Sequence, residues 1–521
     1  MKRWTFAVLA VLLPLGTMGA QPRAGNPFEG PAAGVATHPI DSPVRAACRR
    51  RGIEPAPPCS DQVFVRRVFL DVIGTLPDPA EVTAFLADRR SSKREALIDA
   101  LLERPEYADY QSLKWCDILR VKAEFPINLW PNAVQAYHRW IRDFLRENRP
   151  LDRVARDLLT RSGSNFREPP VNFWRGVQSR DPQGLAQAVA LTFMGSRVET
   201  WPAEMRNGFA PFFSRVAFKR TLEWKEEIVF ANPAATEFLT ATFPDGQVAR
   251  IAPDEDPRAV FADWLLAPGN PWFARNIVNR VWAWLLGRGV IHEPDDIRPD
   301  NPPSIPELLG NLEKEFVAAR YDLKALFRLI LNSATYQQSP VPRDRRPESE
   351  TLFAHYIVRQ LDAEVLIDAL CKITGSGETY SSPIPEPFTY IPEEERSIVL
   401  SDGSITSSFL ELFGRPGRDT GLESERSLKP TEAQRRFLLN STDVQGRIDR
   451  SVNLRRLGLA ARSNPREFVR QLYLLVLSRE PTTEEIAVVE KYARTPGLSP
   501  GQVLSDLVWA LVNTKEFLFR H

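Results

Sequence analysis

The stretch from residue 256 to 339 constrains the fold most, because helix starts and helix ends can be identified in it residue by residue. Asp256-Pro257 and Asn270-Pro271 each place a hydrogen-bond acceptor before a proline at the first helical position. Apolar residues follow at intervals of three and four, as on the buried face of a helix, and Gly269 and Gly287 end the two segments. The turn between them is short, so the sequence predicts two helices packed antiparallel.

Polar residues interrupt the apolar face of the second helix. Asn279 and Arg280 lie within it, and a buried guanidinium is costly unless a carboxylate pairs with it. The acidic, proline-containing loop after this helix supplies Asp295 and Asp296, and Asp263 is a third candidate partner. Two interpretations stay open: a structural ion pair that attaches the loop to the helix, and a pocket for a ligand or for catalysis.

Further helix starts follow the acidic loop. Ser304 and Glu307 have the spacing of a capping box, and Asp322 precedes another amphipathic segment. Similar patterns fill most of the chain. The predicted fold class is therefore mainly α, with multi-helical, bundle-like domains.

The predicted β structure is small. Strand-like segments at 227–230 and 247–251 flank Pro244-Asp245-Gly246 and indicate a strand-turn-strand excursion near 227–251, with further short strands near 385–405. These changes of pattern divide the chain into the following parts: a signal peptide at 1–20, a flexible lead-in at 21–60, an N-terminal helical domain at 61–215, a β-containing connector at 216–255 and a C-terminal helical domain at 256–521.

The N-terminus has the three parts of a secretory signal peptide: Lys2 and Arg3, an apolar run over 6–15, and small residues near Ala20. The run is too short to cross a bilayer, so we expect a periplasmic or secreted protein without a membrane span after cleavage. Export permits disulfides, and Cys48 and Cys59, which flank a short proline-containing turn, are the predicted pair.

Charge and motifs exclude several classes of partner and cofactor. The formal net charge is +1, and no basic run is interleaved with aromatic residues, which argues against nucleic acid. The sequence contains no CxxC, CxxCH or HExxH. We therefore predict no metal and no cofactor.

The two ends of the chain contain similar patterns. Residues 65–82 align without a gap on 469–486, and Pro105-Glu106-Tyr107 corresponds to Lys515-Glu516-Phe517. This suggests that 465–520 is a second copy of the helical unit at 61–110. The alternative is that any two amphipathic helical hairpins look alike.

Several motifs together resemble a known family. In the C-terminal half these are Asn270-Pro271, Asn279-Arg280-Val281-Trp282, Gly287-Arg288-Gly289, Pro294-Asp295-Asp296, Leu331-Asn332-Ser333-Ala334-Thr335-Tyr336, Phe413-Gly414-Arg415-Pro416 and Glu423-Ser424-Glu425-Arg426-Ser427, and in the N-terminal half Arg66-Arg67-Val68-Phe69-Leu70-Asp71. They resemble the two members of a tandem pair of bacterial domains of unknown function, found in the planctomycete-type cytochrome-associated secreted proteins. The resemblance covers most of the chain from about residue 60 and implies the domains, not a reaction.

The chain departs from this family at one motif. In many relatives a Phe-Leu-Gly-x-Arg segment leads into CxxCH, which would attach a c-type haem. Here Thr200, Ala203 and Glu204 stand at the Cys, Cys and His positions. Leu422 and Ser424 also stand where relatives often carry cysteines. This chain is therefore predicted not to hold that haem.

Three functions are compared. The first is a non-catalytic binding or scaffold protein, whose partner is an exported sulfatase-like protein, as the resemblance implies, or a cell-surface glycan. The second is a hydrolase acting on polysaccharide, with carboxylates of the 295–296 loop beside Arg280, Arg415, Glu425 and Arg426. The third, electron transfer, needs a haem or metal centre. Convergence of these side chains on an open cleft would favour the hydrolase.

Overall fold

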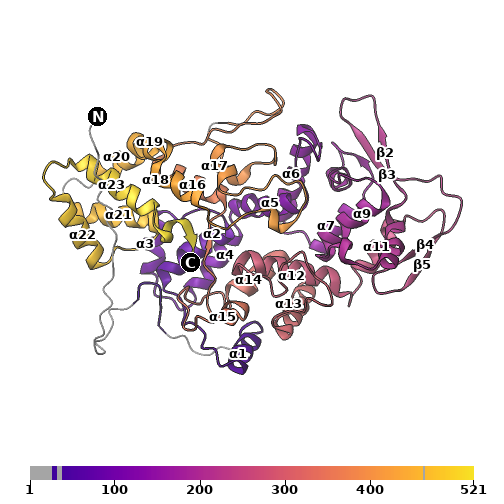
Figure 1. Ribbon diagram of the computed structural model, residues 1–521, viewed down its shortest axis with the longest axis horizontal. Helices are drawn as coiled ribbons and strands as arrows, with labels where there is room; N and C mark the ends of the chain where they lie inside the picture. Colours follow the sequence, from indigo (N-terminus) through magenta and orange to yellow (C-terminus); the bar gives the residue numbers. More distant parts are fainter. Residues whose placement is uncertain (1–25, 32–37, 393, 461–463) are drawn as a thin grey trace.

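The computed structural model describes residues 26–31, 38–392, 394–460 and 464–521. The predicted signal peptide at 1–20 lies outside these residues. As predicted, the protein is mainly helical, and the strands of the described part form only small sheets. In Figure 1 the helices nearest the C-terminus lie at one end of the molecule, α2 to α6 lie in the middle, and β2 to β5 with α11 lie at the other end.

The helices run through both halves of the chain. Up to residue 256 the α-helices are α1 (Asp41–Arg50), α2 (Asp61–Val72), α3 (Pro79–Ala87), α4 (Lys93–Leu102), α5 (Pro105–Ile118), α6 (Pro131–Arg146), α7 (Leu151–Thr160), α8 (Asn172–Arg175), α9 (Pro182–Val189) and α10 (Ala203–Phe209). After it come α11 (Pro257–Leu265), α12 (Pro271–Leu286), α13 (Pro306–Ala318), α14 (Leu323–Leu331), α15 (Pro347–Thr351), α16 (Ala363–Thr374), α17 (Ser408–Leu412), α18 (Glu432–Asn440), α19 (Thr442–Arg450), α20 (Val452–Ala460), α21 (Pro465–Leu477), α22 (Thr483–Ala493), α23 (Pro500–Val512) and α24 (Lys515–Leu518).

The helix signals in the 256–339 stretch are mostly confirmed. Asp256 and Asn270 cap α11 and α12 by accepting hydrogen bonds from backbone amides two residues on, and Gly287 ends α12 with a φ of 82°. Asp322 caps α14. The capping box at Ser304 is wrong: α13 begins one residue later than that box requires, at Pro306, and the Ser304 hydroxyl has no partner among the described residues.

The predicted antiparallel packing of α11 on α12 is not the main contact of either helix. Helix α11 packs on α7 and on the short helix η4 (Ala210–Phe213), and α12 packs on α13 and α14. Contacts between aromatic rings explain this packing. The ring centre of Phe261 on α11 lies 5.3 Å from that of Phe209 and 5.4 Å from that of Phe213. These rings cover the apolar face of α11.

The strands differ in part from the prediction. Three antiparallel pairings involve β1 (Gly163–Ser164), β2 (Val216–Arg220), β3 (Glu227–Ala231), β4 (Leu239–Thr242) and β5 (Val248–Ile251). The turn at 244–246 does join two strands, but β5 pairs with β4, and β3 pairs with β1 and β2. A fourth pairing joins β6 (Arg359–Gln360) to β7 (Phe519–Arg520).

The short strands predicted near 385–405 are not formed in the described residues. Residues 397–399 form a short 3-10 helix, η5 (Ser397–Val399), and a single bridge joins Ser381 to Thr406. The physical reason is Asp368, whose carboxylate accepts the backbone amides of Ser397 and Ile398 at 2.7 and 3.2 Å, so these amides do not form a β ladder.

The region predicted as a flexible lead-in contains an ordered helix. Helix α1 (Asp41–Arg50) buries Val44 and Ala47. Its first residue, Asp41, accepts the backbone amides of Ala334 and Thr335 at 2.9 and 2.8 Å. These contacts join residues nearly 300 positions apart and attach the lead-in to the segment just after α14. Local sequence patterns do not indicate such contacts.

The predicted disulfide between Cys48 and Cys59 is wrong, since both thiols are free and buried. Cys48 lies on α1, and its Sγ is 3.7 Å from the carbonyl oxygen of Leu352. Cys59 lies in an extended segment whose amide donates to Gln337 at 2.7 Å. The two cysteines are therefore held against different neighbours.

Two hydrophobic cores organise the molecule. The first contains residues from Ile40 to Tyr356 together with Ile384 and Leu474. The second contains most buried apolar residues after 360 and also Leu70, Leu76, Tyr110 and Leu113 from the N-terminal half. Helix α5 thus borders both cores, and Arg426, one of the predicted polar residues, pairs with Asp117 on this helix.

Candidate functional site

Arg280 of α12 is buried, with 1% of the residue exposed, and pairs with Asp295 of the acidic loop. Its other contacts are Asn276 Oδ1 at 2.9 Å and the Leu191 carbonyl oxygen at 3.0 Å. Glu423 lies 3.7 Å from the guanidinium, and its amide donates to Asp295 at 2.6 Å. The structure therefore contains the predicted ion pair between helix and loop.

Two of the predicted residues near Arg280 lie apart from this pair. Asn279 exchanges hydrogen bonds with both backbone groups of Ile291, each at 2.9 Å, and so fixes the turn after α12. Asp296 pairs with Arg298 at 3.0 Å. The adjacent carboxylates of Asp295 and Asp296 thus have different partners and do not form an acid–base pair.

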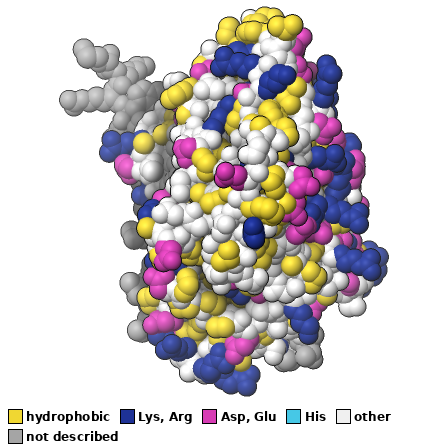
Figure 2. Space-filling model, turned by 90° about the vertical axis from the view of Figure 1, so that its right-hand side faces the viewer, with side chains coloured by type: hydrophobic (Ala, Val, Ile, Leu, Met, Phe, Trp, Pro, Cys, Tyr) yellow, Lys and Arg dark blue, Asp and Glu magenta, His cyan; other side chains and the backbone are white. Residues whose placement is uncertain are grey.

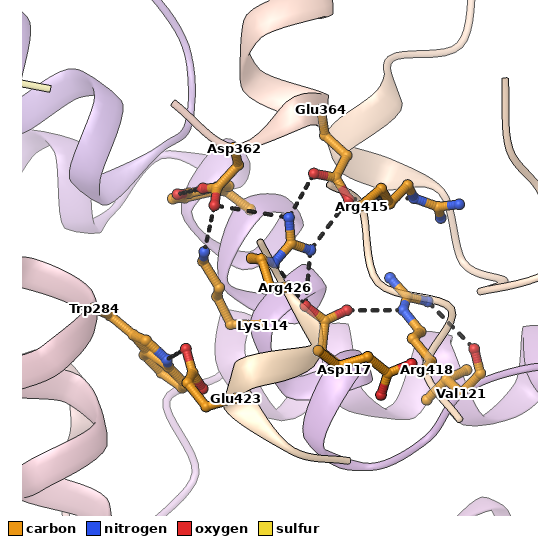
Figure 3. A network of polar contacts seen from close by, with 12 residues as sticks. Lys114, Asp117, Val121, Trp284, Asp362, Glu364, Arg415, Arg418, Glu423 and Arg426 are labelled. Carbon is orange, nitrogen blue, oxygen red and sulfur yellow. Dashed lines mark hydrogen bonds and ion pairs between the residues drawn. The ribbon is translucent and has the colours of Figure 1, made fainter. Parts of the chain in front are cut away.

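Arg426 is the centre of a second, larger ion network (Figure 3). Its guanidinium lies 2.8 Å from Asp117, 2.6 Å from Glu364 and 3.7 Å from Asp362. Asp117 belongs to α5, Asp362 directly precedes α16, and Glu364 lies in its first turn. One side chain from the loop before α18 therefore joins helices from both halves of the chain.

Further cations complete the network. Arg415 lies 3.2 Å from Glu364, Arg418 lies 3.0 Å from Asp117, and Lys114 lies 3.0 Å from Asp362. Figure 3 shows Glu423 on the far side of Lys114, bonded to the indole of Trp284 at 2.9 Å. Each carboxylate of the network thus faces at least one cation.

Glu425 does not join this network. Its carboxylate accepts the backbone amides of Asp419 and Thr420 at 2.8 and 3.1 Å and the Thr420 hydroxyl at 2.7 Å. It therefore shapes the loop at 417–425. Of the seven predicted residues, the structure brings Arg415 and Arg426 together, places Arg280 and Asp295 in a neighbouring pair, and places the other three in local contacts.

The carboxylates of the network are held ionised. Burial alone would raise the pKa of Asp362, but Lys114, Arg520 and Arg426 outweigh it and lower the pKa well below its ordinary value. The pKa of Glu364 is likewise lowered, because Arg426 and Arg415 outweigh burial. A general acid needs a proton near neutral pH, so these two groups are suited to structural pairing.

Sequence reasoning missed Lys114, Asp117, Asp362 and Glu364. A signal existed in α5, where Lys114 and Asp117 flank Trp115 and Cys116, so that charged residues adjoin residues expected to be buried. No comparable signal identifies Asp362 and Glu364, whose positions at the start of α16 are typical of exposed N-terminal acids.

A cavity of about 460 Å³ lies beside the ion network of Arg426. Its wall combines the turn after α8, helix α9, the short helix η3 (Val198–Thr200) and the loop at 419–422. Thr200 and Leu422, two positions at which the family resemblance places cysteines, both line it. Ala203 and Glu204 are exposed at the start of α10.

A wider cleft of about 1220 Å³ lies under the segment at 375–396, and Asp368 lines it. Burial raises the pKa of Asp368 to about 6, against the opposing effects of Arg396 and of two backbone amides. Asp368 is the carboxylate whose hydrogen bonds form η5, so its first role is to hold that segment.

Within the described residues, no group of three or more His, Cys, Asp or Glu side chains is placed to hold a metal ion. The search for membrane spans, over the same residues, found no helix with the length and apolar character that crossing a bilayer requires.

Fold and site together define a class: a mainly helical protein in which a buried ion network joins both halves of the chain. Residues 39–200 match the family model PSCyt2, described as a protein of unknown function (DUF1549), and residues 257–493 match PSD1, described as a protein of unknown function (DUF1553). The chain therefore belongs to the proteins that carry these two domains in tandem, which confirms the pair that the motifs predict. No curated protein and no solved structure matches it.

Proposed function

We propose that the protein is an exported, non-haem binding or scaffold protein that acts with a partner in the periplasm or at the cell surface. The observation that carries this proposal is an exposed aromatic cluster. Trp130, Trp224 and Phe388 lie with ring centres 4.7 to 5.8 Å apart, and Lys225 lies over the Trp130 and Trp224 rings.

This aromatic cluster differs from a hydrophobic core because two of its rings are exposed. Trp224 is 57% exposed, Phe388 is 43% exposed, and Leu222 beside Trp224 is fully exposed. Its members come from three segments: the start of α6, the β2–β3 hairpin and the loop after α16. Exposed apolar patches of this kind mark interaction surfaces, and tryptophan is enriched at the residues that dominate protein–protein binding energy.

The end of the molecule that carries β2 to β5 supports an interaction surface. Figure 2 shows hydrophobic side chains gathered at its top and along its middle, between side chains of both charges. Large exposed hydrophobic residues from this part of the chain are Leu222, Trp224, Phe238 and Val248. Mixed charge around apolar groups is typical of a partner surface with a polar rim.

The contacts of the predicted polar residues support a non-catalytic role. Asp295 is paired with Arg280, and Arg415 and Arg426 are paired with Glu364. Asp296 pairs with Arg298, and Glu425 accepts backbone amides, so the residues of the hydrolase alternative are divided among separate structural contacts. Acid–base catalysis requires a group that can reach a substrate proton. The hydrolase alternative therefore loses its support, and electron transfer lacks the haem-attaching residues at 200, 203 and 204.

The test is recovery of a partner from the exported fraction of the source cells with the immobilised full protein. We expect an exported protein, such as a sulfatase-like one, to bind, and Trp224→Ser to lose this binding, because Trp224 is more exposed than Phe388 and Trp130 is partly buried. Val488→Ser is the control, since Val488 is 56% exposed but lies on α22, at the opposite end of the molecule.

Equal recovery of the partner by both variants would show that the partner binds a surface other than the aromatic cluster. Binding of a glycan array in place of a protein would assign a cell-surface glycan as the partner. Failure to recover any protein and to bind any glycan would contradict the proposal.

A further inference from the structure

The 460 Å³ cavity beside the ion network contains a buried cation without a carboxylate partner. Arg120 follows α5, lines this cavity and is only 3% exposed. Its Nε donates to the Gly176 carbonyl oxygen at 3.1 Å, and its Nη2 is buried with no acceptor among the described residues. A buried guanidinium in this state is costly, because burial removes the water that would solvate it.

Several other buried arginines in the described part of the chain also keep one unpaired nitrogen, but they have more partners than Arg120. Arg280, Arg418 and Arg426 each pair with a carboxylate. Arg67, which has no such pair, donates to two carbonyl oxygens and lies 3.7 Å from the Tyr356 ring centre. Arg120 has one hydrogen bond in the described residues and a contact with the Phe173 ring at 5.5 Å.

Arg120 directly follows the C-cap of α5, where a left-handed residue is a common way for a helix to end. Its φ is 56°, in the left-handed region that side-chain-bearing residues rarely adopt. Burial lowers its pKa to about 10, so the group stays protonated at neutral pH. The fold thus holds a buried, charged guanidinium at the wall of a cavity.

A second unpaired donor lines the same cavity. Arg197 pairs with Glu293 through Nη2 at 3.2 Å, but its Nε is buried with no partner within the described residues. The two acids of the wall do not fill this role: Asp419 pairs with Lys122 at 2.6 Å, and Glu199 is exposed.

The rest of the wall suits a small organic molecule. Val177, Ala188, Leu191 and Leu422 supply apolar surface, and the side chains of Gln178, Ser179, Gln187, Thr200 and Thr420 supply polar groups. The volume lies within the usual range for ligand pockets, about 300–1,000 Å³. An oxyanion is the group that a guanidinium fork binds best. The Nη1 atoms of Arg120 and Arg197 have no hydrogen bond among the described residues and are available to it.

We propose that this cavity is a binding site for a small organic anion, whose oxyanion head is bound by Arg120 and Arg197 and whose uncharged body contacts the apolar wall. The site goes beyond the proposed partner surface and shares no residue with the aromatic cluster. A carboxylate, a sulfate ester and a phosphate ester share the required chemistry.

The test is titration calorimetry of the full protein with four matched probes: benzoate, phenyl sulfate, phenyl phosphate and neutral benzamide. We expect at least one anion to bind and benzamide not to bind. Arg120→Gln should weaken binding about 10- to 100-fold, the loss expected for one hydrogen bond to a charged group. This substitution keeps an unbranched side chain at the left-handed position, so the backbone is not newly strained.

A second variant keeps the proposal testable if Arg120→Gln does not fold. Gln187→Trp places a large group on an exposed residue of the cavity wall and should block the anion. Gln183→Trp is its matched control, because Gln183 is exposed on the same helix but is not part of the wall.

The preferred anion distinguishes a carboxylate, sulfate or phosphate ligand. The proposal is overturned if no anion binds wild-type protein at millimolar concentration, or if Arg120→Gln and Gln187→Trp bind it as tightly as wild type.

Discussion

Removal of the central cation of the ion network tests whether the network stabilises the protein. In Arg426→Met the guanidinium between Asp117 and Glu364 is lost, although both carboxylates stay buried or nearly so, with side chains 13% and 0% exposed. Removal of one partner of a buried pair typically costs about 3–5 kcal/mol. The variant should therefore lose about that much free energy of unfolding.

The expected thermal shift follows from chain length. At about 2.1 cal/mol/K per residue, the entropy of unfolding of the 521-residue chain is about 1.1 kcal/mol/K, so the loss corresponds to a Tm lower by about 3–5 °C. The shift is larger if only the second core unfolds in the affected transition. Differential scanning calorimetry measures it.

Arg436→Met is the matched control for Arg426→Met. Arg436 forms an ion pair with Glu432 at 3.0 Å on α18, but its side chain is 75% exposed. Exposed pairs of this kind contribute about 0–1 kcal/mol. If Arg426→Met lowers Tm no more than Arg436→Met, the network does not stabilise the fold and the reasoning is refuted.

Three further predictions concern single groups. Because the folded pKa of Asp368 is about 6, above the ordinary value of 3.8, its contribution to stability falls by about 3 kcal/mol as pH rises from about 4 to 6. Denaturant titrations of Asp368→Asn against pH should lack this fall, and parallel curves for the two proteins would contradict it. All four cysteines should react with a thiol reagent in the unfolded, non-reduced protein. A count of only two reactive thiols would instead show that a disulfide is present. Without ligand, Arg120→Gln should leave the free energy of unfolding unchanged or raise it by up to about 1 kcal/mol, because it removes an unpaired buried charge; a loss comparable to that of Arg426→Met would show that Arg120 is structural.

Local signals explain which parts of the fold the sequence predicts. Helix caps act within three or four residues, so Asp256, Asn270 and Asp322 identify helix starts without knowledge of the rest of the chain. Arg280 is predicted to pair with the acidic loop because a buried cation needs a partner and the loop is near in sequence.

Contacts distant in sequence explain what the prediction missed. Asp41 caps amides at 334–335, and Arg426 reaches Asp117 across 309 residues, so neither partner can be inferred from its neighbours. The disulfide was predicted from proximity in sequence, but Cys48 and Cys59 contact different segments in space.

The proposed repeat stays a prediction, with which the local features of the two segments agree. Gly74 and Ser478 occupy equivalent positions and both have φ near 60°. Capping boxes follow at Asp78 with Glu81 and at Thr482 with Glu485. Helices α2 to α4 and the start of α5 lie in 61–110, and α21 to α24 lie in 465–520; a superposition in which they pack differently would refute the repeat.

We expect the two family domains to depend on each other for folding, which gives a final prediction. Asp71 of α2 is 4% exposed and accepts hydrogen bonds from Tyr336 at 2.9 Å and Tyr356 at 3.0 Å, and Arg359 lies 3.1 Å away. All three partners lie after residue 256.

A fragment of residues 39–256 would therefore leave Asp71 without these partners. Lys114 would lose Asp362, and Leu70 and Leu113 would lose the second core. Burial of one large apolar side chain contributes about 1.5–3 kcal/mol, and a domain has about 5–15 kcal/mol of stability in total. The fragment should therefore bind a hydrophobic dye and lack a cooperative thermal transition. A fragment with sharp melting and native near-ultraviolet circular dichroism would show that the N-terminal domain folds alone. The ion network would then only hold together two domains that fold independently.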